Sequence, residues 1–151
     1  MKIFNVKEII EYAIQIEKES FEFYTHASND NGVEEVKDLL IRLAGEEVSH
    51  QNRLKGLIDE GKVTPETLLK EMEIDTTVMD RIVETSIIPI GAVALDVLKI
   101  ALEREKNTER TYGMLMTLTQ ISDDVVEVFE DLRLQEQGHV NKIEARISKI
   151  S

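Results

Sequence analysis

Two stretches of the sequence decide the fold: Glu47-Val48-Ser49-His50 and Glu136-Gln137-Gly138-His139. In each stretch a glutamate stands three positions before a histidine, and this spacing places both side chains on one face of a helix. Apolar residues at helical spacing flank both stretches, Leu43 and Leu54 around the first and Leu132 and Ile143 around the second. The glutamates and histidines are therefore predicted to point into the core of a helical protein.

Each stretch follows a helical segment that carries one glutamate on its predicted core face. Thirty positions separate Glu17 from Glu47, and 31 positions separate Glu105 from Glu136. A tyrosine stands seven positions after each of these glutamates, Tyr24 in the first case and Tyr112 in the second. The sequence thus repeats one unit, a helix with a single glutamate followed by a helix with Glu-x-x-His. The two units could be related by a pseudo-twofold axis.

The spacing of the apolar residues predicts four long helices arranged as two antiparallel helical hairpins. The first hairpin covers residues 6–61. Its first helix spans about 6–28, after a possible capping box of Asn5 and Glu8, and its second helix runs to Gly61. The second hairpin covers residues 89–150. Pro89 is expected in the first turn of its first helix, which ends near Gln120, and Ser122 is expected to cap its second helix.

Residues 62–88 are predicted to form a crossover that joins the two hairpins. Thr64-Pro65-Glu66 is typical of the start of a short helix, and the segment is long enough to run the length of a bundle. Such a connection allows the second and third long helices to run parallel. We therefore expect a single domain over residues 1–151, an all-α four-helix bundle.

The composition limits the function. The chain has 151 residues, a formal charge of -12 at pH 7 and no cysteine. Any metal must be held by nitrogen and oxygen, and the negative charge makes nucleic acid an unfavourable partner. We see no apolar stretch of the roughly 18 residues that a membrane span needs, and no cleavable leader at the N-terminus. A soluble, cytoplasmic protein without a membrane partner is expected.

Four carboxylates on the core face require positive charge, because a buried unpaired carboxylate costs several kcal/mol or must take up a proton. Two divalent cations would balance four carboxylates and two neutral imidazoles. The candidate metal ligands are Glu17, Glu47, His50, Glu105, Glu136 and His139. The open alternative is a bundle whose glutamates are solvated or protonated.

Tyr24 and Tyr112 are the candidate catalytic residues. Helix side chains lean toward the N-terminus, so each phenol is brought back toward the carboxylates. A hydrogen bond from each phenol to a ligand carboxylate is expected, and packing as ordinary core aromatic residues is the alternative.

The pattern Glu17…Tyr24, Glu47-x-x-His50, Glu105…Tyr112, Glu136-x-x-His139 resembles the diiron domain of rubrerythrin, within the ferritin-like superfamily. The resemblance covers nearly the whole chain and implies a ferritin-like fold with two iron ions. It implies that Glu47 and Glu136 bridge the irons, that Glu17 and Glu105 are terminal ligands and that each histidine binds one iron. Nitrogen and oxygen ligands would also hold Mn or Zn.

The resemblance also implies an oxidoreductase that acts on hydrogen peroxide or oxygen. Without cysteine for a rubredoxin-type iron, electrons would come from an external donor, and a homodimer is expected. The family's additional glutamate on the third helix has no counterpart, since Asn107 and Thr108 stand there, and whether Glu109 replaces it is open. A ferroxidase or iron-handling protein with Fe²⁺ as substrate is the first alternative. A non-catalytic metal-binding structural bundle is the second.

Overall fold

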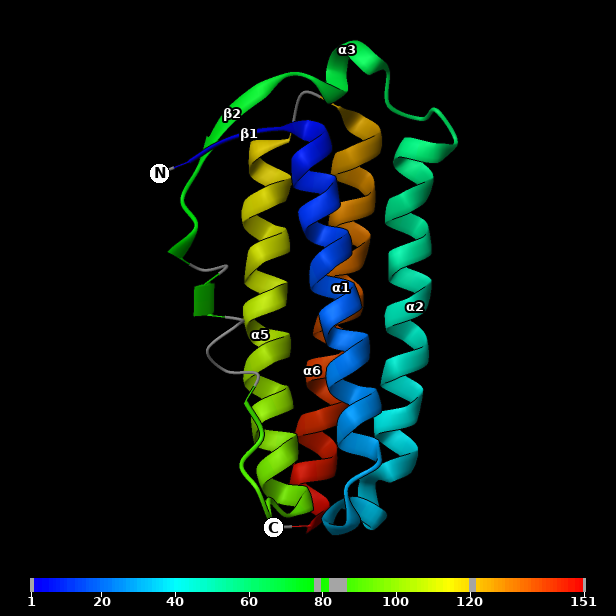
Figure 1. The fold of residues 1–151 in the computed structure, drawn as a ribbon, viewed down its shortest axis with the longest axis vertical. Helices are drawn as coiled ribbons and strands as arrows, with labels where there is room; N and C mark the ends of the chain where they lie inside the picture. Colours follow the sequence, from blue (N-terminus) through cyan, green and yellow to red (C-terminus); the bar gives the residue numbers. More distant parts are fainter. Residues whose placement is uncertain (1, 78–79, 82–86, 120–121, 151) are drawn as a thin grey trace.

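The described residues form four long helices, which run side by side along the molecule (Figure 1). The computed structural model describes residues 2–77, 80–81, 87–119 and 122–150. The long helices are α1 (Val6–Ser28), α2 (Lys37–Asp59), α5 (Ala94–Leu118) and α6 (Asp123–Ile150). The prediction of an all-α four-helix bundle is confirmed.

The helices form two hairpins, α1 with α2 and α5 with α6 (Figure 1). A 3₁₀ helix, Asn31–Val36, makes the turn between α1 and α2. In Figure 1, α1 and α6 run downward, whereas α2 and α5 both run upward. The long connection between the hairpins therefore produces the parallel pair that its length allowed.

The start of α1 has the predicted capping box. The Asn5 side chain accepts a hydrogen bond from the Glu8 backbone N–H at 2.8 Å, and the Glu8 carboxylate accepts one from the Asn5 N–H at 3.0 Å. Both donors would otherwise lack a partner at the helix end. At the start of α6, the Ser122 hydroxyl accepts a hydrogen bond from the Val125 N–H at 3.4 Å, as expected of an N-cap.

The prediction that Pro89 lies in the first turn of the third long helix is wrong, because α5 begins at Ala94. The Ala92 N–H donates to the Pro89 carbonyl at 3.2 Å, and Gly91 has φ +79°. These features define a tight turn whose left-handed position suits glycine and cannot continue a right-handed helix. Helix α5 ends at Leu118, close to the predicted end at Gln120, which lies outside the described residues.

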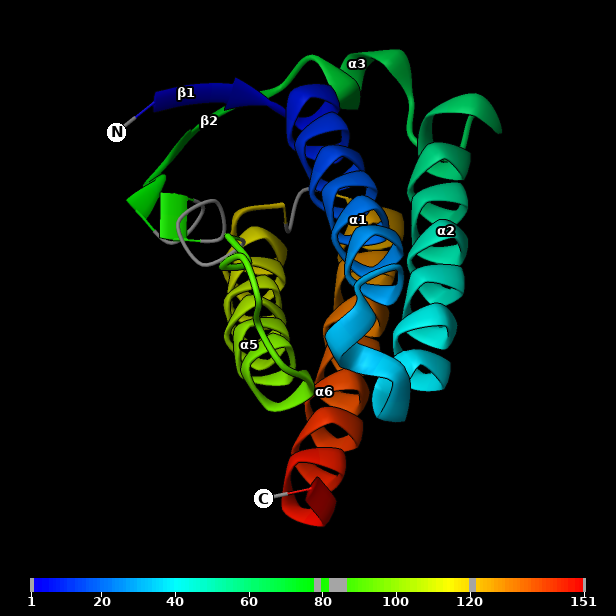
Figure 2. The same cartoon turned by 60° about the horizontal axis from the view of Figure 1, so that its bottom comes forward.

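A two-stranded sheet pairs the crossover with the N-terminal segment. The sequence analysis did not predict this sheet. Strand β1 (Lys2–Asn5) pairs antiparallel with β2 (Glu71–Ile74), with Phe4 opposite Met72. Figure 2 shows the pair extending sideways from the start of α1. Between α2 and β2 lies the predicted short helix α3 (Pro65–Leu68), where the Thr64 hydroxyl accepts from the Thr67 N–H at 3.2 Å.

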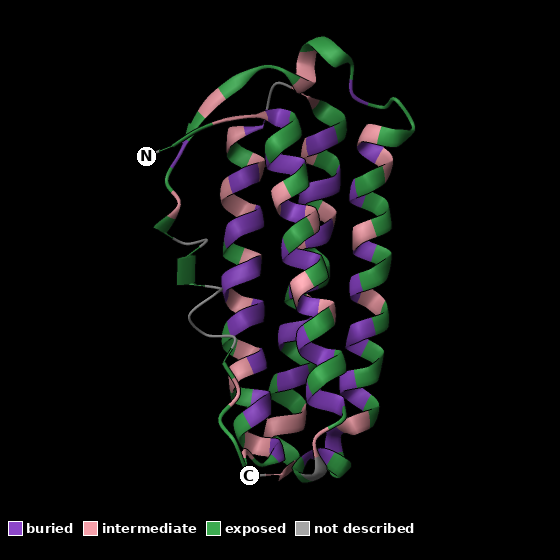
Figure 3. Cartoon of the chain, viewed as in Figure 1, coloured by how far each residue is buried: buried purple, intermediate pink, exposed green. Residues whose placement is uncertain are grey.

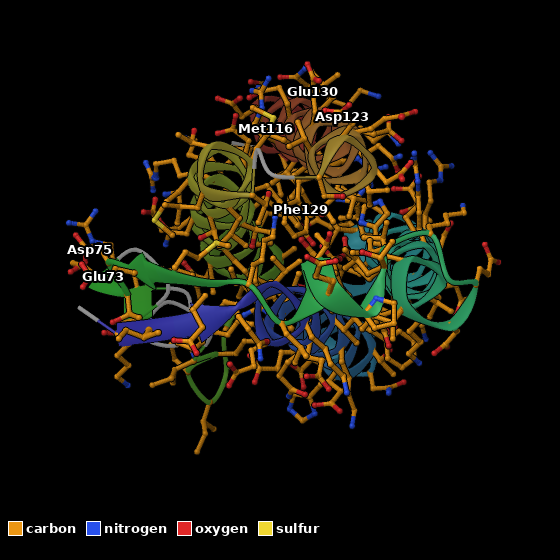
Figure 4. The ribbon with its side chains drawn as sticks, turned by 90° about the horizontal axis from the view of Figure 1, so that it is seen from above. Glu73, Asp75, Met116, Asp123, Phe129 and Glu130 are labelled. Carbon is orange, nitrogen blue, oxygen red and sulfur yellow. The ribbon has the colours of Figure 1, made fainter. Side chains whose placement is uncertain are left out.

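The buried faces of the four long helices point toward one another (Figure 3). They form two apolar clusters, one toward each end of the bundle. Phe129 belongs to the cluster near the start of α1 and points inward in Figure 4, whereas Glu130 and Asp123 point outward. The buried glutamates and histidines belong to neither cluster. They form a polar layer between two apolar ones.

No helix in the described ranges has an apolar run long enough to cross a membrane.

Candidate metal centre

Each long helix contributes to one buried group of acidic and imidazole side chains at the middle of the bundle. α1 and α5 each provide one glutamate, and α2 and α6 each provide a glutamate and a histidine one turn later. The structure brings together all six residues predicted as ligands, Glu17, Glu47, His50, Glu105, Glu136 and His139. None of them is more than 3% exposed.

The six side chains form two overlapping sets of potential ligand atoms. One set contains Glu17, Glu47, His50 and Glu136, and the other contains Glu47, Glu105, Glu136 and His139; within each set the ligand atoms lie within 4.8 Å of one another. Glu47 and Glu136 belong to both sets. Two cation positions that share these carboxylates therefore fit between the hairpins.

The Nδ1 atoms of both histidines face the carboxylates. His50 Nδ1 lies 3.2 Å from Glu17 Oε2 and 3.1 Å from Glu136 Oε1. His139 Nδ1 lies 3.2 Å from Glu47 Oε1 and 3.5 Å from Glu105 Oε2. The imidazole rings are stacked 5.6 Å apart with an interplanar angle of 12°. The two histidines thus present equivalent nitrogens to the two sets.

Each tyrosine donates a hydrogen bond to a carboxylate of the opposite hairpin. The Tyr24 hydroxyl donates to Glu105 Oε1 at 2.5 Å, and the Tyr112 hydroxyl donates to Glu17 Oε1 at 2.6 Å. The expected hydrogen bonds to carboxylates of the group are present, and the structure adds that they cross between the hairpins. A catalytic role for the two tyrosines stays a prediction.

The four carboxyl groups divide into two pairs with opposite pKa shifts. Burial raises the pKa of Glu47 well above its usual range, and repulsion from Glu136 adds to this. The pKa of Glu136 is raised in the same way by burial and by Glu105. Burial also acts on Glu17, but the neighbouring Glu47 side chain and the hydrogen bond with His50 lower its pKa overall. Without metal, burial and mutual repulsion therefore favour the protonated form of the two shared glutamates.

The pKa values of Glu105 and of the two imidazoles are also shifted by their neighbours. Burial would raise the pKa of Glu105, but the neighbouring Glu136 and His139 side chains lower it to about 2. Burial would lower the pKa of His50, but the close carboxylates of Glu136 and Glu17 raise it to about 10. Similar contacts raise the pKa of His139. In the absence of metal, the protons on the histidines and shared glutamates provide the compensation that cations would otherwise supply.

The tyrosine phenols remain hydrogen-bond donors. Burial raises the pKa of Tyr24 well above its ordinary value, and the adjacent Glu105 raises it further. Burial and Glu17 act on Tyr112 in the same direction. Neither phenol therefore ionises near neutral pH.

Several buried ligand atoms have no hydrogen-bond partner of suitable geometry among the described residues. They are both carboxylate oxygens of Glu47, both of Glu136, Glu105 Oε2 and His139 Nδ1. Buried polar atoms are nearly always paired, so such a cluster is unusual. All of these atoms belong to the two ligand sets. The donor set, four carboxylates and two imidazoles, fits a pair of divalent cations.

Arg104 is a buried cation beside the group that the sequence analysis did not single out. It is 1% exposed and precedes Glu105 on α5. Its Nε donates to Ser20 Oγ at 3.1 Å, and its Nη2 donates to the Ile16 carbonyl at 3.4 Å. It therefore joins α5 to α1. The sequence feature that could have drawn attention to Arg104 is its position directly before Glu105, a predicted core residue.

Glu109 belongs to neither ligand set. Its carboxylate accepts a hydrogen bond from Arg133 Nη1 at 3.2 Å, which ties it to α6. Thr108 is buried, and its hydroxyl donates to the Arg104 carbonyl at 3.0 Å. Asn107 accepts a hydrogen bond from Arg110. At these positions of α5, no carboxylate of a described residue joins the two sets.

The model of a protein family described as Rubrerythrin matches residues 8–147. No curated protein and no solved structure matches the chain.

Proposed function

Because this chain belongs to the rubrerythrin family, we propose that it is a non-haem diiron-carboxylate protein that reduces hydrogen peroxide or reacts with oxygen. The family match covers residues 8–147, which include every residue of the candidate centre. Four ionised carboxylates and two neutral imidazoles would balance the charge of two Fe²⁺ ions. Mn or Zn would be held by the same atoms.

The observation that carries this proposal is the cluster of unpaired ligand atoms shared between two sets. Glu47 and Glu136 occur in both sets, so they are the proposed bridging ligands. Glu17 and Glu105 each occur in one set and are the proposed terminal ligands, with one histidine for each position. Carboxylates and imidazoles bind metal in their deprotonated forms, so iron binding should release protons from the group.

Reduction of hydrogen peroxide to two water molecules takes two electrons and two protons. Two ferrous ions, when bound, would supply the two electrons. The chain's own contribution is to hold the ligands in a buried layer closed at both ends by apolar clusters. The phenols of Tyr24 and Tyr112 fix the orientation of the terminal carboxylates through short hydrogen bonds. An electron donor outside these 151 residues completes the proposed cycle.

The first experiment is elemental analysis of protein purified under anaerobic conditions. We expect about two irons per chain, and loss of iron in Glu47→Ala and Glu136→Ala. Glu11→Ala is the matched control, because Glu11 is exposed on α1 and belongs to neither set. No metal in the wild-type protein, with stability unaffected by the two core substitutions, would overturn the diiron proposal.

The second experiment separates the proposed oxidoreductase from the iron-handling and structural alternatives. The reduced protein is mixed with hydrogen peroxide in a stopped-flow spectrometer without oxygen. Oxidation of both irons by one equivalent of peroxide would support the oxidoreductase. Uptake of many Fe²⁺ ions per chain would favour iron handling, and absence of any reaction would favour a structural metal site.

A further inference from the structure

Glu46 and Gln135 occupy equivalent positions outside the two histidines. Each directly precedes the glutamate of a Glu-x-x-His stretch, one on α2 and the other on α6. Gln135 Oε1 lies 2.7 Å from His50 Nε2, and Glu46 Oε2 lies 2.6 Å from His139 Nε2. Each residue thus reaches across the seam between α2 and α6 to the histidine of the other hairpin.

These contacts determine which imidazole nitrogen is available to a metal. When a metal ion replaces the proton on Nδ1, an oxygen acceptor beside Nε2 keeps the remaining proton on Nε2, so the lone pair of Nδ1 is the one available to the metal. The Nδ1 atoms are the ones that face the carboxylate sets. Glu46 and Gln135 therefore orient both imidazoles for coordination through Nδ1.

The two acceptors differ in charge. A carboxylate polarises an imidazole N–H more strongly than a neutral amide does, and this raises the basicity of the opposite nitrogen. His139 is therefore the stronger ligand of the pair. The Glu46 carboxylate is oriented by Lys142, whose Nζ lies 3.3 Å from Oε1. Glu46 Oε2 makes no hydrogen bond to a described residue, and its contact with His139 Nε2 is an ion pair, so the polarisation of the imidazole is electrostatic.

We propose that Glu46 and Gln135 are positioning residues that make the two metal positions unequal, so that the position at His139 binds the first divalent cation. The inference rests on the proposed metal centre and adds the order in which its two positions bind metal ions. It concerns the pair of residues just outside the ligand sets, which line a surface pocket of about 190 Å³ with Gly138, His139 and Lys142.

The test is a calorimetric titration of the metal-free protein with Zn²⁺, which is redox-inert. The wild-type protein should show two binding steps of different affinity. Glu46→Gln should weaken the tighter step by about 10- to 100-fold and bring the two steps together. Gln135→Glu should strengthen the weaker step. Because Glu46 is half-buried and Gln135 is exposed, both variants are expected to fold, and circular dichroism checks this.

Gln137→Glu is the matched control. It makes the same chemical change as Gln135→Glu on α6, but Gln137 is exposed and donates to Asn141. Neither binding step should change in this variant. Titration with Co²⁺ provides a second readout, because the absorption bands of the first bound ion should change in Glu46→Gln and remain in Gln137→Glu.

The outcomes distinguish the two proposals. Two zinc ions bound with affinities that Glu46→Gln and Gln135→Glu leave unchanged would overturn the positioning role and leave the metal centre standing. Two zinc ions with equal affinities in the wild-type protein would overturn the inequality. Failure of the wild-type protein to bind zinc would overturn both the metal centre and the inference built on it.

Discussion

Replacement of Tyr112 by phenylalanine removes one hydroxyl group and little else. The ring lies 5.7 Å from the ring of Phe129 and is completely buried, so a phenylalanine keeps the packing. What is lost is the hydrogen bond of 2.6 Å to Glu17 Oε1. Glu17 then has a buried carboxylate oxygen without this donor.

The size of the effect follows from the burial and charge of this pair. Hydrogen bonds to charged groups contribute about 1.5–3 kcal/mol, and both partners here are fully buried. We therefore expect Tyr112→Phe to lower the free energy of unfolding of the metal-free protein by about 2 kcal/mol. With an unfolding entropy of about 0.3 kcal/mol per kelvin for 151 residues, the melting temperature should fall by about 6 °C. The affinity for Zn²⁺ should fall by about 10- to 100-fold.

The assay is urea unfolding of the metal-free protein, followed by calorimetric titration with Zn²⁺. Tyr12→Phe is the control, because Tyr12 is only partly buried and its hydroxyl makes no hydrogen bond to another described residue. We expect this control to change the free energy of unfolding by less than about 0.5 kcal/mol. A double-mutant cycle with Glu17→Gln should show coupling between the two positions.

A Tyr112→Phe protein with the stability and zinc affinity of the wild type would refute this reasoning. The phenol would then be an ordinary core aromatic that happens to lie beside the carboxylate. A loss of stability without coupling to Glu17 would likewise refute the hydrogen bond as its cause.

In the metal-free protein, His50 has a pKa of about 10 when folded against 6.5 when unfolded, so the folded state binds the extra proton between these values. The free energy of unfolding should therefore fall as pH rises through this window, by about 1.4 kcal/mol per pH unit for this group. The raised pKa of Glu47 acts in the same direction above pH 4.5, and urea unfolding from pH 6 to 9 should show the decline. Gly32→Ala should destabilise the protein by about 1–2 kcal/mol, because its Cβ would come within 2.8 Å of a facing backbone carbonyl. Gly45→Ala, on the open side of α2, should instead stabilise it by about 0.5–1 kcal/mol in the same unfolding assay. Arg104→Met should cost about 2–3 kcal/mol, measured in the same way, because it leaves buried acceptors on α1 without their donor.

The six candidate ligands could be predicted from the sequence because their signals are local. A glutamate and a histidine three positions apart share a helix face whatever the tertiary structure, and the flanking leucines indicate which face is buried. The matched spacing of these residues in the two halves of the sequence indicated that all six belong to one group. The single-domain assignment over residues 1–151 remains a prediction.

The features that the sequence did not predict depend on contacts between distant segments. Strand β1 is four residues long, with two exposed residues followed by two half-buried ones, so it lacks the alternating pattern that indicates a strand. Its partner begins 66 positions after Asn5. Which glutamate each tyrosine contacts depends on how the hairpins face each other. Pro89 suits the first turn of a helix, and the sequence therefore favoured a helix start there. Gly91, two positions later, has a left-handed backbone conformation, so the segment forms a turn instead.

Each hairpin carries half of the centre: two carboxylates of the four, one histidine and one tyrosine. Its tyrosine has its acceptor in the other hairpin, and its histidine has the residue that orients it there as well. The chain is in this sense a covalent dimer of two half-sites, with the crossover as a tether. A protein of half the length would need a second copy of itself to present the same constellation. We expect the two fragments of a chain cut within residues 62–88 to associate through the shared group.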